Sequence, residues 1–325
     1  MRIGLIGIIT GIVWTVSTPV MAEKPSFEGY VASLKQEGIN KGIDISLIDK
    51  AFNGIRHREK AVKADRNQPE MRLTLNEYIS LAVPDWKVKK ARRLYAEHYN
   101  GLKRIGDHYG VQPRFLVSLW GIESNFGALI GNYDVLEALT TLAYDGRRED
   151  FFRAEIFSAL TILQQGHIDV REMKGSWAGA MGQCQFLPSS FLSFAADGNN
   201  DGKKDIWNSE LDVFASSANY LNNVGWDNNY TWGRKVTLPK KLDINLLGLS
   251  EGKARSLAEW QAIGIKPVNR KKFPNVDINA WLIQPDHRNG QAYIVYGNYQ
   301  SLMKWNRSHY FALAVSHLAD KIKSI

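Results

Sequence analysis

One apolar segment determines how the rest of this chain is interpreted: residues 114–127, RFLVSLWGIESNFG. Positions three and four apart share a face of an α-helix, so Phe115, Leu119 and Glu123 form one stripe. A carboxylate therefore occupies a position where the pattern favours a hydrophobic residue. Burial raises the pKa of a carboxyl group, and the partially negative carbonyl end of a helix acts in the same direction. A carboxyl group that stays protonated near neutral pH is suited to general acid catalysis.

The alternative for Glu123 is a solvent-exposed residue on a helix that simply ends at Gly127. For a single glutamate this structural interpretation is the default. The choice between the two depends on the other motifs of the chain.

The first 22 residues have the pattern of an export signal. Arg2 provides a positive start, Ile3 to Val16 is mostly apolar, and residues 20–22 resemble a small-residue cleavage site. The segment contains no cysteine, so a lipid anchor at such a residue is excluded. We expect residues 1–22 to be removed and the protein to act in the periplasm, with a retained membrane anchor as the alternative.

Composition narrows the range of partners. The formal net charge is +8, which suits a polyanionic polymer of the cell envelope. No nucleic-acid-binding motif is present, so nucleic acid is not an expected partner.

Cys184 is the single cysteine, which excludes an internal disulfide and a zinc site built from paired cysteines. A lone cysteine in an apolar setting is most often inert packing.

Hydrophobic periodicity predicts a mainly α (α+β) chain with four parts after the signal. They are an N-terminal helical domain over residues 23–110, a core over 111–225, a small β-rich domain over 226–297, and a C-terminal helix over 298–325 that returns to the core. The clearest single elements are helices at 85–108, 150–165 and 210–224 and short strands at 236–239, 281–283 and 293–296. Residues 174–190 are rich in Gly, Ser and Gln, and a long irregular segment of this kind is often functional.

Residues 197–208 match the twelve-residue cation loop of EF-hands. The expected oxygen ligands are Asp197, Asn199, Asp201, Lys203 (through its carbonyl), Asp205 and Asn208. The last of these stands where a bidentate glutamate is usual, which lowers the expected affinity. We expect a structural Ca²⁺ or Na⁺ here. The alternative is an Asx-rich turn without metal.

These motifs together resemble the B-type lytic murein transglycosylases, glycoside hydrolase family 103. The segment GIESNFG at 121–127 is similar to the catalytic signature of lytic transglycosylases. The B type is indicated by LAYDGRR at 142–148, GSWAGAMGQ at 175–183, QFLPSS at 185–190, the cation loop, and NRS at 306–308. The resemblance extends over nearly all of the chain after residue 22.

The resemblance implies a lysozyme-like core with an additional N-terminal helical domain and a small β-rich insertion. It implies that Glu123 is the only catalytic acid and base, and that no cofactor takes part in the chemistry. The residues expected to line the sugar groove are Ser176, Gln185, Tyr220 and Asn306. Expected partners are peptidoglycan glycan strands and proteins of cell-wall synthesis or remodelling, and the expected oligomeric state is a monomer.

Two features depart from the family pattern. Cys184 stands where proline or glycine is common, which can alter the loop beside Gln185. Trp305 and Phe311 stand where tyrosine is common. Stacking on a sugar can persist with these residues, but a hydroxyl contact cannot.

The implied reaction cleaves the β-1,4 bond between MurNAc and GlcNAc and leaves a 1,6-anhydro-MurNAc end. An ordinary glycosidase uses two carboxylates across the scissile bond. The other candidates, Glu137, Asp145, Glu149 and Asp150, lack the apolar, glycine-bounded setting of Glu123. Two alternatives stay open: a hydrolytic muramidase of the same polymer, and a non-catalytic scaffold that binds glycan.

Overall fold

The structure is a computed structural model that describes residues 24–66, 73–269, 272–286 and 290–323. The expected signal, residues 1–22, lies outside the described residues. Within the described ranges, every helix is too short or too polar to span a membrane.

The N-terminal part is helical, as the sequence predicts. Its helices are α1 (Phe27–Asn40), α2 (Ile45–Phe52), α3 (Glu59–Arg66), α4 (Leu75–Ala82), α5 (Asp85–Glu97) and α6 (Tyr99–Tyr109). The single helix expected over 85–108 is wrong, because the chain breaks at His98 between α5 and α6. The His98 ring packs edge-on against Trp120 and Phe214, with centroids 5.9 and 5.6 Å away. This anchoring in the core coincides with the break between α5 and α6.

Helix α7 (Pro113–Ser124) is the centre of the molecule, packed against α5, α6, α11 (Glu210–Asn223) and α14 (His309–Lys323). Pro113 occupies its first turn, where a missing N–H costs nothing. The remaining elements around it are β1 (Tyr133–Asp134), α8 (Val135–Asp145), α9 (Glu149–Gln164), β2 (Lys174–Gly175), α10 (Pro188–Phe194) and α13 (Gly297–Trp305). Strands β1 and β2 form a two-stranded antiparallel ladder.

Helix α8 was not predicted from the sequence, and its burial explains why. Residues 135–143 are all buried, so this stretch has no solvent-exposed face, and its polar residues Glu137, Thr140 and Thr141 face the protein interior. Helices α9 and α11 keep such a face, and their observed bounds agree with the predicted ranges within one residue.

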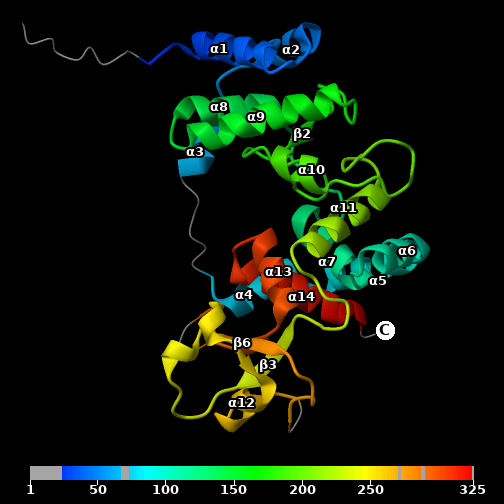
Figure 1. The fold of residues 1–325 in the computed structure, drawn as a ribbon, viewed down its shortest axis with the longest axis vertical. Coiled ribbons are helices and arrows are strands. Elements are labelled where there is room, and N and C mark those ends of the chain that lie inside the picture. Colours follow the sequence, from blue (N-terminus) through cyan, green and yellow to red (C-terminus); the bar gives the residue numbers. More distant parts are fainter. Residues whose placement is uncertain (1–23, 67–72, 270–271, 287–289, 324–325) are drawn as a thin grey trace, which may run out of the picture.

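The β-rich part has its own sheet and its own hydrophobic cluster. Strands β3 (Gly233–Thr237), β4 (Arg255–Ser256), β5 (Lys266–Pro267), β6 (Asn279–Ile283) and β7 (Ala292–Val295) form an antiparallel sheet in the order β4-β6-β7-β3-β5. Helix α12 (Leu257–Ala262) packs beside it, with Trp260, Leu282 and Ile294 fully buried in the cluster. The sheet lies at one end of the molecule and α1 and α2 at the other (Figure 1).

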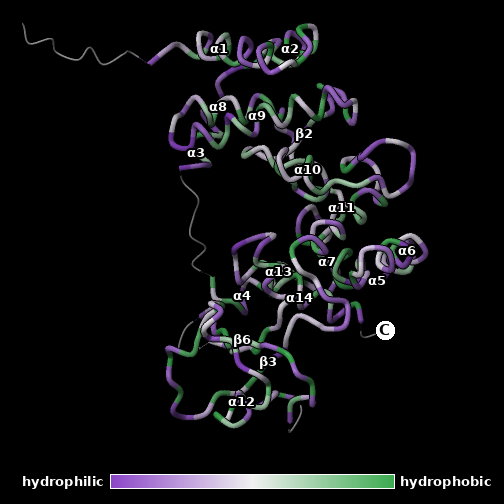
Figure 2. The backbone as a smooth tube through the Cα atoms, in the orientation of Figure 1, coloured by the Kyte–Doolittle hydropathy of each residue, from purple (hydrophilic) through white to green (hydrophobic). Residues whose placement is uncertain are grey.

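The predicted class, mainly helical with small sheets, is confirmed. The loop between α10 and α11, which carries residues 197–208, is drawn mainly in the hydrophilic colour (Figure 2). Helix α7 crosses the interior between this loop and α14.

Candidate active site

Glu123 lies in the last turn of α7, and the chain beyond it adopts an unusual backbone conformation. Asn125, Phe126 and Gly127 have φ angles of 52°, 60° and 78°, so three consecutive residues are left-handed. This conformation is costly for a bulky side chain such as that of Phe126. A Cβ atom on Gly127 would lie 2.3 Å from Oε1 of Gln183, so only glycine fits there. The glycine-bounded motif therefore fixes the exit of the chain next to Glu123.

Gln183 holds this region together, and the sequence analysis did not single it out. Its amide oxygen accepts a hydrogen bond from Nε1 of Trp120 at 2.6 Å, and its Nε2 donates to the carbonyl of Trp207 at 2.8 Å. Gln183 is 6% exposed, so both bonds are shielded from water. One buried amide thus joins α7, the 174–190 segment and the end of the 197–208 loop. Gln183 is the last residue of the family-like segment GSWAGAMGQ, and this position could have identified it from the sequence.

The Glu123 carboxylate has a neutral partner. Nε1 of Trp305 donates to Oε1 of Glu123 at 2.5 Å. Burial raises the pKa of Glu123 to about 7, and the bond from Trp305 opposes that rise. Lys87 and Lys90 of α5 donate to the carbonyls of Gly121 and Asn125 at 3.3 and 3.5 Å, which satisfies the end of α7. The carboxyl group is therefore poised to exchange a proton near neutral pH.

An aromatic wall, defined here as Phe186, Tyr220 and Trp305, surrounds this bond. The Trp305 ring lies 4.8 Å from that of Tyr220 and 5.3 Å from that of Phe186. The Tyr220 hydroxyl donates to the carbonyl of Lys304 at 2.8 Å, next to Trp305. The tryptophan at position 305 thus supplies an N–H contact to Glu123 as well as an aromatic face.

The other expected sugar-binding residues continue from this wall. Gln185 precedes Phe186, and its Nε2 donates to the carbonyls of Ile130 and Gly182 at 3.2 and 2.8 Å, which leaves its oxygen free of those bonds. Met181 forms antiparallel β-bridges with Phe186 and with Gly175. Gly175 precedes Ser176, so these bridges connect the backbone at Phe186 to the backbone next to Ser176.

Ser176 and Asn306 differ in how many hydrogen bonds their side chains make within the protein. The Ser176 hydroxyl accepts N–H bonds from Ala178 and Ala180 at 3.3 and 3.1 Å, so its own proton can still be donated. Asn306 follows Trp305 and is exposed. Both residues therefore retain polar groups that a ligand can use.

The other acidic candidates bond elsewhere. Glu137 pairs with Arg58, Asp145 pairs with Arg66 at 2.5 Å, and the Tyr30 hydroxyl donates to Glu149 at 3.0 Å. Throughout the described ranges, no bond or ion pair links a second carboxylate to Glu123. Glu137, Asp145 and Glu149 are thus each engaged in contacts of their own.

A family model described as Transglycosylase SLT domain matches residues 26–320. The chain belongs to this transglycosylase family. The resemblance predicted from the sequence is confirmed by this match and by a curated relative, membrane-bound lytic murein transglycosylase B of Escherichia coli K12. That protein is 31% identical over 231 residues, which are 70% of this chain and 61% of the relative. The alignment thus spans less than two thirds of the relative's length.

Solved structures of transglycosylases share the fold. SltB3 of Pseudomonas aeruginosa in complex with NAG-NAM-pentapeptide is 39% identical, with a TM-score of 0.89 over 92% of this chain and 80% of that chain. SltB3 has also been solved with NAG-anhNAM-pentapeptide. Slt35 of E. coli in complex with calcium is 24% identical, with a TM-score of 0.78 over 90% of this chain and 92% of that chain. This last likeness shows the fold alone.

In this transglycosylase chain the cation loop is closed by its own hydrogen bonds. Asp197 accepts N–H bonds from Asn200 at 2.6 Å and Gly202 at 2.8 Å, and Nδ2 of Asn208 donates to Asp205 at 3.1 Å. Gly202 has a φ of 89°, as the turn position requires. Across the described residues, no group of three or more His, Cys, Asp or Glu is gathered around one point. The donor set is all oxygen, which is the chemistry a hard cation needs.

Asp212 of α11 ties both halves of that loop to the transglycosylase core, and the sequence analysis did not identify it. Its carboxylate accepts the N–H of Gly198 at 2.8 Å and that of Asp205 at 2.7 Å. It is fully buried, and burial raises its pKa. Cys184, whose Sγ lies 3.8 Å from the carbonyl of Val213, is also buried, which raises the pKa of the thiol and fits the predicted inert packing.

Proposed function

We propose that the protein is a peptidoglycan lytic transglycosylase that cleaves the MurNAc-β-1,4-GlcNAc bond and forms 1,6-anhydro-MurNAc ends. The observation that carries this proposal is the single acid, Glu123, whose pKa is raised to about 7 beside the aromatic wall. Membership of the transglycosylase family and the two SltB3 complexes support the choice of polymer.

The first step uses Glu123 as an acid. Its proton passes to the glycosidic oxygen, the bond from C1 of MurNAc to that oxygen breaks, and the GlcNAc side leaves as an alcohol. The N-acetyl carbonyl of MurNAc bonds to C1 and stabilises the cationic centre, a form of substrate assistance. A carboxyl group with a pKa near 7 is half protonated at neutral pH, which suits this step.

The second step uses the resulting carboxylate as a base. Glu123 takes the proton of the MurNAc 6-hydroxyl, whose oxygen attacks C1 and displaces the N-acetyl oxygen. The ring closes, the acid is regenerated, and no water is consumed. The indole N–H of Trp305 supports the first step, because it stabilises the carboxylate that forms when Glu123 gives up its proton. Holding the 6-hydroxyl near C1 is a positioning effect that can contribute on the order of 7 kcal/mol.

The groove proposed for the glycan runs along Ser176, Gln185, Tyr220 and Asn306. The free oxygen of Gln185, the hydroxyl proton of Ser176 and the exposed amide of Asn306 supply hydrogen-bonding groups. The Tyr220 hydroxyl is occupied by Lys304, so this residue would contribute its ring. The proposed division into a helical domain, a core, a β-rich domain and a returning helix follows the ranges given above.

Mass spectrometry of products from purified peptidoglycan tests the proposal. Muropeptides lighter than hydrolytic products by one water, and absent with Glu123→Gln, are the expected result. Products with the full mass of hydrolysis would show that water attacks the sugar, and the protein would then be a hydrolytic muramidase. Binding without any product from the wild-type protein would replace the proposal with the glycan-binding scaffold.

The proposal extends to location, partners and the cation. With peptidoglycan as substrate, the proposal places the protein in the periplasm, where it would act as a monomer and encounter proteins of cell-wall synthesis or remodelling. A structural Ca²⁺ or Na⁺ would be held by Asp197, Asn199, Asp201, Asp205 and Asn208 and by the carbonyl of Lys203. This rests on their spacing and the all-oxygen donor set. A rise in melting temperature with millimolar Ca²⁺, absent in Asp201→Ala, is expected, whereas equal melting temperatures would leave an Asx-rich turn.

A further inference from the structure

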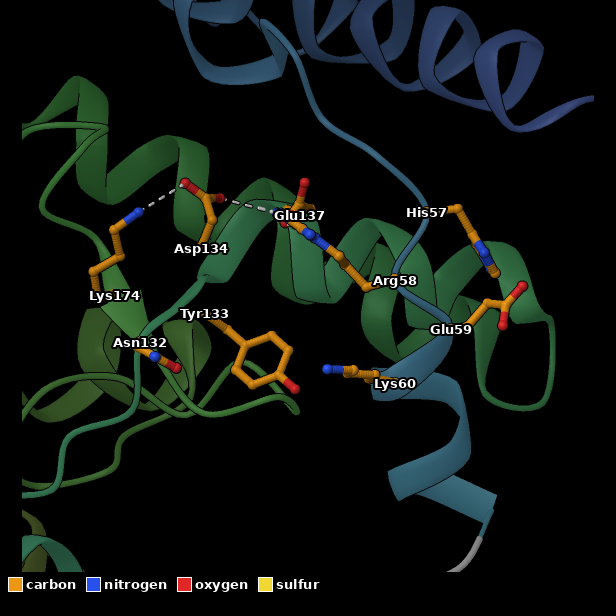
Figure 3. A pocket seen from close by; sticks show the side chains of 9 residues that line it. All are labelled: His57, Arg58, Glu59, Lys60, Asn132, Tyr133, Asp134, Glu137 and Lys174. Atoms are coloured by element: carbon orange, nitrogen blue, oxygen red, sulfur yellow. Dashed lines mark hydrogen bonds and ion pairs between the residues drawn. The ribbon is translucent and has the colours of Figure 1, made fainter.

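A cavity of about 700 Å³ lies apart from Glu123, between residues 57–60 and the β1–β2 ladder. Polar and charged side chains line it almost completely (Figure 3). They are His57, Arg58, Glu59, Lys60, Asn132, Tyr133, Asp134, Glu137 and Lys174. A space of this size accommodates a short peptide or one to two sugars.

A buried carboxylate fixes one wall of the cavity. Glu137 of α8, 7% exposed, accepts the N–H of Arg56 at 3.0 Å and a bond from Nε of Arg58. The N–H of Arg58 donates to Oγ1 of Thr141 at 3.1 Å. About half of the Arg58 side chain (51%) is nevertheless exposed. Arg58 is thus rigidly held at its base, with terminal N–H groups that remain accessible at the cavity.

Lys60 supplies an uncommitted cation. Its ammonium group points across the cavity towards the Tyr133 ring, whereas Glu59 points away (Figure 3). Lys60 has no hydrogen bond or ion pair in the part of the chain that the structure describes. The acids around it are engaged: Glu137 with Arg58, Asp134 with Lys174 at 3.6 Å, and Glu59 with Lys63 at 3.8 Å. The Lys60 ammonium is therefore the charge in this cavity that an added anion can pair with.

The cavity is joined to the proposed glycan groove through β2. Lys174 pairs with Asp134 in the ladder, Gly175 pairs with Tyr133, and Ser176 follows directly. A substituent of a sugar bound at Ser176 can therefore reach the cavity along one short strand. In peptidoglycan the substituent of MurNAc is the peptide stem, which carries carboxylates.

We propose that this cavity binds the peptide stem of peptidoglycan through a stem carboxylate, with Lys60 and Arg58 as the cationic contacts. The inference rests on the proposed function. The anchored guanidinium offers a directional contact and the lysine a point charge. The enzyme would accordingly bind peptide-bearing strands more tightly than naked ones.

The test compares two substrates and two matched lysine variants. The substrates are peptidoglycan strands with intact stems and the same strands after enzymatic removal of the stems. Lys60→Ala is expected to raise KM for stem-bearing strands about three- to tenfold, the range for a half-exposed charge contact, and to leave kcat and naked strands unchanged. Lys241→Ala, at an exposed lysine of the β-rich part outside the cavity, is expected to change neither. Lys60→Glu is expected to raise KM further for stem-bearing strands alone.

Two outcomes would overturn the inference: an equal rise in KM for both substrates, or no change with either. Titration of NAG-NAM-pentapeptide into Glu123→Gln, with and without Lys60→Ala, separates the inference from the proposed function. Weaker binding in the double variant supports the stem site even if the wild-type protein forms no products. Unchanged binding removes the stem site even if the wild-type protein is an active transglycosylase.

Discussion

Two glutamates on neighbouring helices show how the same side chain serves different purposes. Glu137 of α8 faces a cation, Arg58, and a main-chain N–H of Arg56. Glu123 of α7 faces a neutral indole, that of Trp305, and an aromatic wall. A carboxylate with a cationic partner holds structure in place, whereas Glu123, which has a neutral partner, has a pKa raised to about 7 by burial. Between these two glutamates, the partner distinguishes the structural acid from the chemical one.

The largest expected effect is on turnover. Glu123→Gln removes the only proposed acid and base, so the rate of anhydro-product formation should fall at least about 10³-fold. Glu137→Gln should reduce turnover less than tenfold, because Glu137 does not contact the proposed groove residues. Product formation from purified peptidoglycan measures both variants. Comparable losses in the two would break the distinction between these glutamates.

For the free energy of unfolding, we expect the loss of the Glu137 carboxylate to be the more damaging change. Glu137→Ala leaves the N–H of Arg56 and the Arg58 guanidinium without their acceptor, at a cost of about 2–3 kcal/mol in the free energy of unfolding. The exposure of Arg58 to water keeps this below the value for a fully buried pair. Urea unfolding at pH 7 measures it. As a control, Glu59→Ala removes an exposed pair with Lys63 and should cost less than 0.5 kcal/mol.

The stability of the wild-type protein should depend on pH because of Glu123. Its pKa is about 7 in the fold and 4.5 in the unfolded chain, so the fold favours the protonated form. The stability from this preference is complete below pH 4.5, falls as the pH rises towards 7, and is absent above it. Glutamine mimics the protonated acid. Glu123→Gln should therefore match the wild type near pH 4.5 and exceed it by about 3 kcal/mol at pH 8. Parallel unfolding curves at the two pH values would contradict the raised pKa.

The sequence predicted one half of this comparison better than the other. Glu123 stood out because a local pattern, the apolar stripe of α7 and its flanking glycines, is enough to show an acid out of place. Glu137 was considered only as a second catalytic candidate, since its partner Arg58 lies 79 residues away and no local pattern joins them. The same holds for Trp305, whose bond to Glu123 spans 182 residues. The sequence marked Trp305 as a departure from tyrosine, but only the fold shows that its N–H bonds to Glu123.

The smallest expected effect sharpens the role of that indole. Trp305→Phe keeps an aromatic ring but removes the donor that opposes the raised pKa of Glu123. The pKa should therefore rise further, and the limb of the pH–rate profile that falls with increasing pH should move to higher pH by about half a unit to one unit. The rate at pH 7 should drop about tenfold, because the carboxylate that forms in the first step loses its hydrogen bond. Trp305→Tyr offers a hydroxyl donor on a smaller ring and should retain more activity than Trp305→Phe. An unshifted limb in Trp305→Phe would mean that the aromatic face alone accounts for Trp305, and that Glu123 differs from Glu137 only by lacking a cation.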